Sequence, residues 1–304
     1  MKYLISGYIG FDNFGDEAIA HILTSNLKKN GAEKVTLISS NPKKTSKIHE
    51  VASCSMLGFL PALLESDTLI SGGGSLLQDV TSFKSLIYYL LVIYTALFLG
   101  KKVEIYAQGI GPINSKIGQF LTKTALKKAY KISVRDINSK NLLEKWGIMS
   151  ELVNDPVLDI ELPQKHKTGI VGIQLRNFNS IDDIFIEKLS KKVAEKFHNK
   201  KIKVISLQDS IDKDICKKFT EHLKNIGVTN VQLETGLDIQ NVFDTISDLE
   251  YLISMRFHAT VLGIKSDVKT VAINYDPKIK SLAETYNIPI LELKNTDFSP
   301  LEKL

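Results

Sequence analysis

The sequence predicts an α/β protein with two domains, each built on a parallel, doubly wound sheet. Short apolar runs typical of strands alternate with helix-like segments along the 304 residues. Glycine-rich or polar loops recur directly after the strand-like runs. Hydrophobic residues make up 43% of the chain and charged residues 24%, which is enough to build sizeable cores. A chain of this length suits two α/β domains of ordinary size.

The first domain is expected over residues 1–158. Its strands are predicted at 3–6, 35–39, 68–71, 103–108 and 131–134, and its helices at 17–29, 86–99, 115–129 and 138–146. The loops that carry functional-looking residues follow strands, at 7–16, 72–79, 108–112 and 135–136. Because open α/β sheets bind ligands at the carboxyl ends of their strands, we expect these loops to share one edge.

Residues 159–167 are mostly polar, contain Pro163 and lack periodicity, so they are expected to form a linker. The second domain is expected over residues 168–304. Its strands are predicted at 169–175, 202–207, 231–234, 251–254 and 270–273, and its helices at 182–198, 214–226, 239–246 and 279–286, with one more after His258. Two Rossmann-like domains that face each other leave a deep cleft, a common site for small substrates.

Charge and cysteine content narrow the class of protein. The net charge of +5 is mild and is most simply explained by solvated lysines, with attraction to an anionic substrate or membrane surface as an alternative. No basic platform interleaved with aromatic residues is present, so no nucleic acid partner is expected. Cys54 and Cys216 form no disulfide or zinc pattern, and no secretory signal pattern is seen, which fits a reducing cytoplasm.

The segment Leu86–Leu99 is almost entirely apolar but is too short to span a bilayer comfortably. We expect a buried helix. A helix that offers an apolar face to the membrane surface or to another subunit of a homo-oligomer is the alternative.

The segment Leu252–Gly263 places Arg256 and His258 between a strand and a helix. Anions are favoured at such a turn, and a histidine can deliver a proton near neutral pH. A histidine packed under a loop and an arginine in an ion pair are the ordinary alternatives.

Two glycine-rich loops precede helices in the first domain. In the first loop, Asn13 and Asp16 lie near the expected helix start, and Asp16 is predicted at the N-cap, where it either caps the helix or acts on a hydroxyl group. In the second loop, Gly72, Gly73 and Gly74 allow a ligand to approach closely, or simply pack the strand against the helix. Neither loop is a dinucleotide fingerprint or a P-loop.

Seven short motifs occur in a fixed order along the chain. They are Gly7 to Glu17 with Asn13-Phe-Gly-Asp16, Gly72-Gly73-Gly74-Ser-Leu-Leu-Gln78-Asp79, Gln108-Gly-Ile-Gly-Pro112, Ser133-Val-Arg135-Asp136, Asp155-Pro156, Ser254-Met-Arg256-Phe-His258-Ala and Tyr275-Asp-Pro-Lys278. Together they resemble the polysaccharide pyruvyl transferase family, closest to the cell-surface-anchoring CsaB type, over residues 3–286.

The resemblance implies a glycosyltransferase-B-like fold and transfer of the pyruvyl group of phosphoenolpyruvate to a sugar as a cyclic ketal. For the CsaB type it implies β-linked N-acetylmannosamine of a lipid-linked cell-wall polysaccharide precursor, ketalised at O4 and O6. The product serves to anchor surface-layer proteins. The resemblance places the family's donor-site residues at Arg135, His258 and Lys278, on both sides of the cleft. The enzyme would work in the cytoplasm, with a peripheral position at the inner face of the plasma membrane as the further option.

The residues suggest a mechanism on that basis. Arg135, Arg256 and Lys278, with backbone amides of a glycine-rich loop, would bind the carboxylate and phosphate of the donor. His258 would protonate carbon C3, and Asp16 or Glu17 would deprotonate the attacking hydroxyl. The ordinary alternatives are a surface position for Lys278 and an ion pair of Arg135 with Asp136 or another carboxylate. No cofactor besides the donor is expected, and no metal, because no cluster has ligand spacing.

Two rival functions stay open. One is a nucleotide-sugar-dependent glycosyltransferase of the same fold, which nucleotide-sugar turnover without a response to phosphoenolpyruvate would favour. The other is a non-catalytic relative that binds a glycan, which an unchanged phenotype of His258→Ala would favour. The sequence does not distinguish between acceptor sugars.

Overall fold

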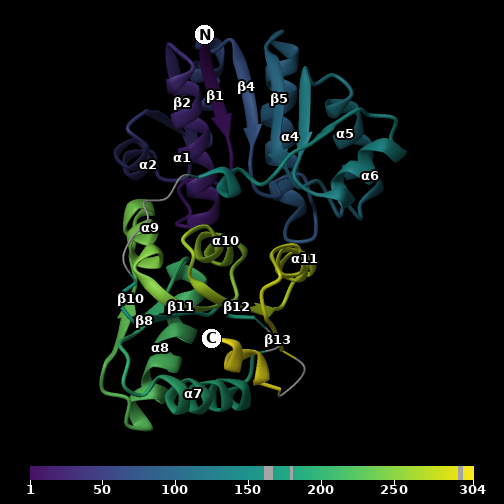
Figure 1. Cartoon of the computed structure of the whole chain (residues 1–304). Helices are drawn as coiled ribbons and strands as arrows, with labels where there is room; N and C mark the ends of the chain where they lie inside the picture. Colours follow the sequence, from purple (N-terminus) through teal and green to yellow (C-terminus); the bar gives the residue numbers. More distant parts are fainter. Residues whose placement is uncertain (161–166, 179–180, 294–296) are drawn as a thin grey trace. The chain divides into compact units, whose positions relative to one another are not determined.

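A computed structural model describes residues 1–160, 167–178, 181–293 and 297–304. The chain forms two compact units, Met1–Ile160 and Glu161–Leu304, which Figure 1 shows coloured along the sequence. Residues 161–166 of the predicted linker lie outside the described residues. Each unit is described by itself.

The first unit holds a parallel sheet with strand order β3-β2-β1-β4-β5-β6-β7. The strands are β1 (Lys2–Ser6), β2 (Lys34–Ser39), β3 (Ala52–Ser55), β4 (Thr68–Gly72), β5 (Lys102–Gln108), β6 (Lys131–Val134) and β7 (Glu151–Leu152). The helices are α1 (Phe14–Lys29), α2 (Pro42–His49), α3 (Phe59–Glu65), α4 (Phe83–Phe98), α5 (Lys116–Leu126), α6 (Ile137–Lys145) and the short η1 (Pro156–Asp159).

The second unit holds a parallel sheet with strand order β10-β9-β8-β11-β12-β13. The strands are β8 (Ile170–Gln174), β9 (Ile202–Ile205), β10 (Val231–Glu234), β11 (Leu249–Ser254), β12 (Lys269–Asn274) and β13 (Ile290–Glu292). The helices are α7 (Asp183–Phe197), α8 (Asp209–Asn225), α9 (Ile239–Ser247), α10 (Phe257–Lys265), α11 (Pro277–Tyr286) and the short η2 (Ser299–Lys303).

The two sheets share one topology, which confirms the predicted fold class. In each, the chain builds outwards from its first strand and then returns to add its fourth strand on the other side of the first. The order reverses between β1 and β4 in the first unit and between β8 and β11 in the second. Ligands of doubly wound sheets bind at such switch points, outside the carboxyl ends of the two strands.

The sequence pattern misses the elements between residues 40 and 67. Helix α2 buries only Thr45 and His49, so it carries no apolar stripe. Strand β3 consists of small residues, Ala-Ser-Cys-Ser, which have little strand propensity by themselves. Helix α8 begins at Asp209, five residues before the predicted start, and α5 ends at Leu126 rather than at residue 129.

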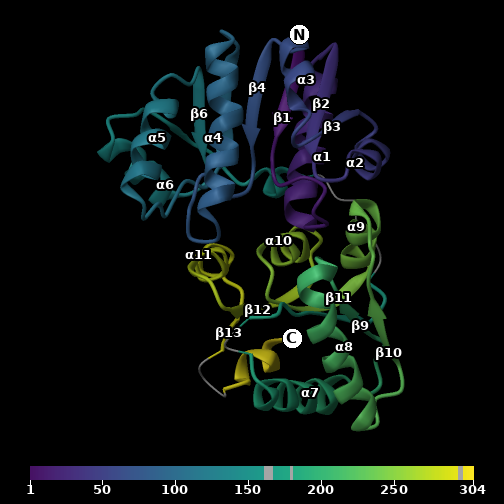
Figure 2. The same ribbon diagram turned by 180° about the vertical axis from the view of Figure 1, so that it is seen from behind.

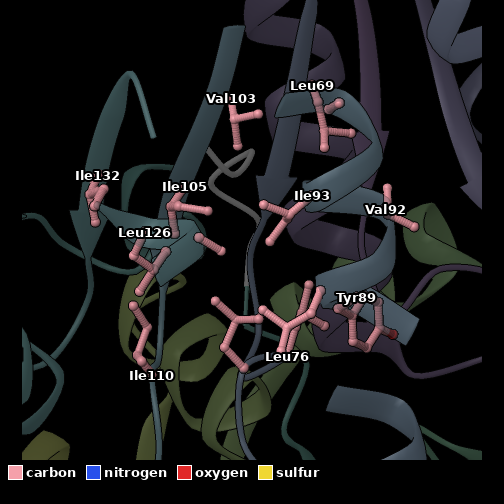
Figure 3. Close-up of a cluster of buried hydrophobic side chains, with 14 of the residues drawn as sticks. Leu69, Leu76, Tyr89, Val92, Ile93, Val103, Ile105, Ile110, Leu126 and Ile132 are labelled. Atoms are coloured by element: carbon pink, nitrogen blue, oxygen red, sulfur yellow. The ribbon is translucent and has the colours of Figure 1, made fainter. Parts of the chain in front are cut away.

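The core of the first unit forms where α4 lies against the sheet (Figure 3). Leu86, Tyr89, Leu90, Val92 and Ile93 of α4 are buried together with Leu69, Val103 and Ile105 of β4 and β5. The prediction of a buried helix therefore holds for this face. The opposite face of α4 exposes large apolar side chains. Within the described residues, no helix combines the length and apolar character needed to cross a bilayer.

Candidate functional site

The loops that follow β4 and β5 are joined through their backbones. The amide of Gly109 donates to the carbonyl of Gly74 at 2.9 Å, and the amide of Gly111 donates to the carbonyl of Leu77 at 2.8 Å. The amide of Gly73 donates to the carbonyl of Tyr106 at 3.0 Å. The predicted loops at 72–79 and 108–112 thus meet at one edge of the sheet. The amide of Gly73 is therefore used in the contact between the two segments.

Gly73 and Gly74 are needed for their conformation and for the space they leave. Their φ angles are 70° and 63°, in the left-handed region that favours glycine. A Cβ on Gly74 would lie 2.5 Å from Oδ1 of Asp16, and a Cβ on Gly73 would lie 2.4 Å from Cγ2 of Ile19. The glycine-rich loop after β4 therefore lies directly against the first turn of α1.

Asn13, and not Asp16, caps helix α1. The side-chain Oδ1 of Asn13 accepts from the amide of Gly15, and its Nδ2 donates to Oδ2 of Asp16 at 2.6 Å. The prediction of Asp16 at the N-cap is wrong by three residues, because the helix begins at Phe14 rather than at Glu17. Asp16 lies in the first turn, where the helix dipole favours a carboxylate.

Two tyrosines lie near Asp16, at the switch point of the first sheet. Burial, and then the charge of Asp16, raise the pKa of Tyr8 and of Tyr89 above the ordinary value. Both side chains therefore stay neutral phenols at physiological pH. The ring of Tyr8 stacks on Phe11 with centroids 4.2 Å apart. Asp16 thus lies against the glycine-rich loop and acts electrostatically on both tyrosines.

The carboxylate of Glu17 stabilises the first glycine-rich loop. Its Oε1 accepts from the amide of Gly10 at 2.6 Å, and its Oε2 lies 2.8 Å from Nε2 of His49 on α2. Glu17 and His49 are both buried. These contacts engage both carboxylate oxygens of Glu17, which counts against Glu17 as a base.

Arg135 connects three segments of the first unit. Its Nη1 donates to Oδ2 of Asp155 at 2.6 Å, and its Nη2 donates to Oγ of Ser75 at 3.3 Å. The ion-pair partner is thus Asp155, which also caps η1 through Val157. Asp136 instead caps α6 by accepting from Ser139. An arginine held by a carboxylate at one nitrogen presents the rest of its guanidinium in a fixed direction.

Gln78 and Asp79 shape the loop that enters α4. Gln78 bonds Thr81 through both its side-chain amide and its side-chain carbonyl. Asp79 accepts from the amides of Asn114 and Ser115 at 2.8 and 2.7 Å. These two hydrogen bonds lower the pKa of Asp79. Asp79 thus connects the loop after β4 to the segment after β5, and Gln78 orders the turn before α4.

Arg256 lies in a buried polar network of the second unit. Its Nε and Nη2 donate to the two carboxylate oxygens of Asp212, each at 2.7 Å, and its Nη2 also donates to Gln208 at 2.9 Å. Its backbone amide donates to Oε1 of Gln174 at 2.7 Å. The sequence predicts that Arg256 binds an anionic substrate. In the structure its guanidinium is instead paired with the carboxylate of Asp212. This pairing fixes the turn between β11 and α10.

His258 and Lys278 occupy equivalent places on neighbouring helices. His258 is the second residue of α10 and is half-buried, and Lys278 is the second residue of α11 and is exposed. Phe257 packs on the cluster formed by Ala272, Ile279 and Ala283, so the first turns of α10 and α11 lie side by side (Figure 1). Asp276 caps α11 by accepting from the amide of Lys278 at 2.9 Å. The helix dipole disfavours a cation in the first turn of a helix. Lys278 therefore does not stabilise α11 through its charge, which favours a functional role for it.

Arg176 is a candidate that the sequence analysis does not single out. It follows β8, so it lies on the other side of the switch point from Arg256 and His258. Its backbone amide contacts Sδ of Met255, and its Nη1 donates to the hydroxyl of Tyr275 at 3.2 Å. Its buried Nε has no hydrogen-bond partner among the described residues. Arg176 closely follows the first strand of the unit, and this position in the sequence could have marked it as a candidate ligand-binding residue.

The chain was compared with protein-family models, with curated proteins and with solved structures. The family model described as "Polysaccharide pyruvyl transferase" matches residues 13–277. No curated protein matches the chain.

Among solved structures, the UDP-GlcNAc 2-epimerase from Methanocaldococcus jannaschii is similar with a TM-score of 0.62 at 12% identity, covering 100% of this chain and 91% of that chain. The UDP-GlcNAc 2-epimerase from Neisseria meningitidis, bound to UDP-GlcNAc, gives 0.61 at 13% identity, covering 99% and 89%. The glycosyltransferase SnogD from Streptomyces nogalater gives 0.54 at 12% identity, covering 100% and 90%. At these identities the likeness concerns the fold alone, and it confirms the glycosyltransferase-B-like class.

Proposed function

Because the chain belongs to the polysaccharide pyruvyl transferase family, we propose that it transfers the pyruvyl group of phosphoenolpyruvate to a cell-wall polysaccharide sugar as a 4,6-ketal, with release of phosphate. The observation that carries the proposal is the grouping of a histidine with cationic side chains at the carboxyl edge of the second sheet. His258 and Arg176 flank its switch point, and Lys278 lies on the neighbouring helix. This set offers both a proton donor and ligands for a small molecule with two anionic groups.

The donor carries a carboxylate and a phosphate on a three-carbon frame, so it needs cations at fixed angles. In the second unit, Lys278 supplies a point charge and Arg176 a guanidinium aligned by Tyr275. The family resemblance also assigns Arg135 of the first unit to the donor; there its guanidinium is held by Asp155 and lies beside Ser75. We assign Arg256 to positioning, because its pair with Asp212 holds the turn that carries His258.

In the proposed reaction His258 donates a proton to carbon C3 of the enol. C2 becomes cation-like and is attacked by one sugar hydroxyl, and the C2–O bond to phosphate breaks. The second hydroxyl then closes the ketal on C2. Two hydroxyl protons are lost in total: one balances the proton gained at C3, and the other leaves on phosphate. No other cofactor enters this balance.

We assign Asp16 as the base that accepts a hydroxyl proton. Its Oδ2 already accepts from Asn13, and its Oδ1 faces the glycine-rich loop. Burial and the charge of Asp16 raise the pKa of Tyr8 and Tyr89, so neither phenol competes with Asp16 as a base. Asn13 holds the carboxylate in one orientation, which is a positioning role.

Gly74→Ala is expected to lower kcat/KM more than Gly31→Ala does. Both glycines have positive φ, 63° and 78°, so both substitutions carry a conformational cost of about 1–2 kcal/mol. A Cβ at Gly31 meets nothing within 4 Å, whereas a Cβ at Gly74 displaces the carboxylate of Asp16. Urea unfolding and steady-state kinetics on both variants separate the shared cost from the displacement. Equal kcat/KM for the two variants would contradict the assignment of Asp16.

Arg176→Met is expected to raise KM for phosphoenolpyruvate by about 10- to 100-fold, because a hydrogen bond between charged groups is worth about 1.5–3 kcal/mol. Tyr275→Phe is the matched control: it keeps the ring and removes only the hydroxyl that aligns Arg176, so its effect should be smaller. Steady-state kcat and KM are measured for both. A loss of kcat at unchanged KM would remove Arg176 from the donor-binding set.

For the acceptor we propose β-N-acetylmannosamine in a lipid-linked precursor, the sugar that the CsaB-type resemblance implies. The product would then anchor surface-layer proteins, and the enzyme would act in the cytoplasm at the inner face of the plasma membrane. The test is phosphate release from phosphoenolpyruvate with a panel of model disaccharides ending in N-acetylmannosamine, galactose or glucose. Release only with the first acceptor supports this choice. Release with a different sugar corrects the acceptor, and turnover of a nucleotide sugar without phosphoenolpyruvate replaces the proposal with a glycosyltransferase.

A further inference from the structure

One outer face of the first unit carries an unusual share of exposed apolar side chains. Among the described residues, 19 large hydrophobic side chains are exposed, and nine of them lie on or beside α3, α4 and α5. We call these nine the α3–α5 apolar surface: Leu57, Leu60, Leu64, Phe83, Ile87, Leu91, Phe98, Ile117 and Phe120. Single exposed apolar residues are normal, but a group on adjacent helices marks an interaction surface.

The helices that carry this surface pack side by side. The hydroxyl of Tyr94 on α4 donates to the carbonyl of Leu121 on α5 at 2.8 Å, and the hydroxyl of Tyr88 donates to the carbonyl of Met56, just before α3, at 3.0 Å. Figure 2 shows α4 beside α5 at this side of the sheet. Phe83, Ile87, Leu91 and Phe98 recur at helical spacing, so they form one stripe along α4.

The charge around α4 and α5 is mostly positive, whereas α3 ends in Glu65 and is followed by Asp67. Between Val80 and Tyr130 the chain has seven lysines and a single acidic residue, Glu104. The lysines are Lys84, Lys101, Lys102, Lys116, Lys123, Lys127 and Lys128. The whole chain carries 39 basic and 34 acidic residues, so this segment holds much of the excess positive charge. Apolar side chains rimmed by lysines fit an anionic lipid surface, which attracts basic residues and accepts apolar ones at its boundary.

We propose that the α3–α5 apolar surface docks the protein on an anionic membrane surface. A second copy of the chain fits less well, because two copies would bring the lysines of residues 80–130 together, and that segment holds a single acidic residue, Glu104. The surface also begins beside the candidate site, since Phe83, the first residue of α4, closely follows Gln78 and Asp79 in the chain.

The test is co-sedimentation of the full chain with vesicles of phosphatidylcholine alone or mixed with phosphatidylglycerol. Binding is expected only with the mixed vesicles, and salt at about 1 M should abolish it by screening. Leu91→Ser/Phe98→Ser is expected to weaken binding about tenfold or more. Lys123→Glu/Lys127→Glu should weaken it to a similar extent.

The control variants match the exposure and chemistry of these changes elsewhere on the chain. Met149→Ser/Ile184→Ser removes side chains that are 94% and 59% exposed, against 90% and 55% for Phe98 and Leu91. Lys188→Glu/Lys217→Glu reverses two charges on α7 and α8. Equal binding to both vesicle types, or equal losses in test and control variants, would overturn the proposal. So would a dimer by light scattering that Leu91→Ser/Phe98→Ser dissociates.

Discussion

His258→Ala is expected to lower kcat for phosphate release by about 10²- to 10⁴-fold, the usual contribution of a general acid. The affinity for phosphoenolpyruvate should change much less, because the cations that bind the donor stay in place. His258 is half-buried at the start of α10, so its loss removes a proton donor and not a core side chain. The measurement is single-turnover phosphate release, with donor binding followed by titration calorimetry.

His198→Ala is the matched control, because it removes an exposed imidazole at the end of α7. It should leave turnover unchanged. His258→Gln adds a second comparison, since glutamine keeps a polar side chain but cannot supply an acidic proton. Loss of donor binding with turnover of the bound fraction intact would make His258 a ligand and not the acid.

Asp212→Ala is expected to destabilise the second unit by about 3–5 kcal/mol. Asp212 is fully buried and takes two hydrogen bonds from Arg256, so its removal leaves a buried guanidinium without its carboxylate. The turn that carries His258 also loses its anchor. The free energy of unfolding from urea titration measures the effect.

Glu187→Ala serves as its control, because Glu187 pairs with Lys191 on the exposed face of α7. Exposed ion pairs contribute little, so this variant should unfold near the wild-type midpoint. If Asp212→Ala kept its stability and instead changed the affinity for phosphoenolpyruvate, Arg256 would return to the set of donor ligands that the sequence suggests.

Much of the fold was predictable because the local patterns are strong. The apolar strands at 68–71 and 131–134 and the polar loops behind them follow directly from composition and turn chemistry. Parallel strands place those loops at one edge, and the hydrogen bond from the amide of Gly109 to the carbonyl of Gly74 confirms it. The polar helix α2 and the small residues of β3 carry no such pattern.

The partners of the candidate site residues were not predictable, because they are set by contacts distant in sequence. Arg256 and Asp212 are 44 residues apart, and Arg135 and Asp155 are 20 apart. A helix predicted from Asp214 leaves Asp212 in a loop, whereas the helix that begins at Asp209 places it in the first turn. Arg176 stands out only once the sheet order shows that β8 and β11 are neighbours.

The most direct test of the account is the structure of the product formed in D₂O from phosphoenolpyruvate and an N-acetylmannosamine acceptor. Protonation of C3 followed by two attacks on C2 predicts a ketal whose methyl group carries one solvent deuterium and whose C2 is bonded to two sugar oxygens. Proton and carbon NMR of the purified product read out both features. A product that keeps vinyl protons, or an acceptor recovered unchanged while phosphate stays on the donor, would contradict the proposed transfer.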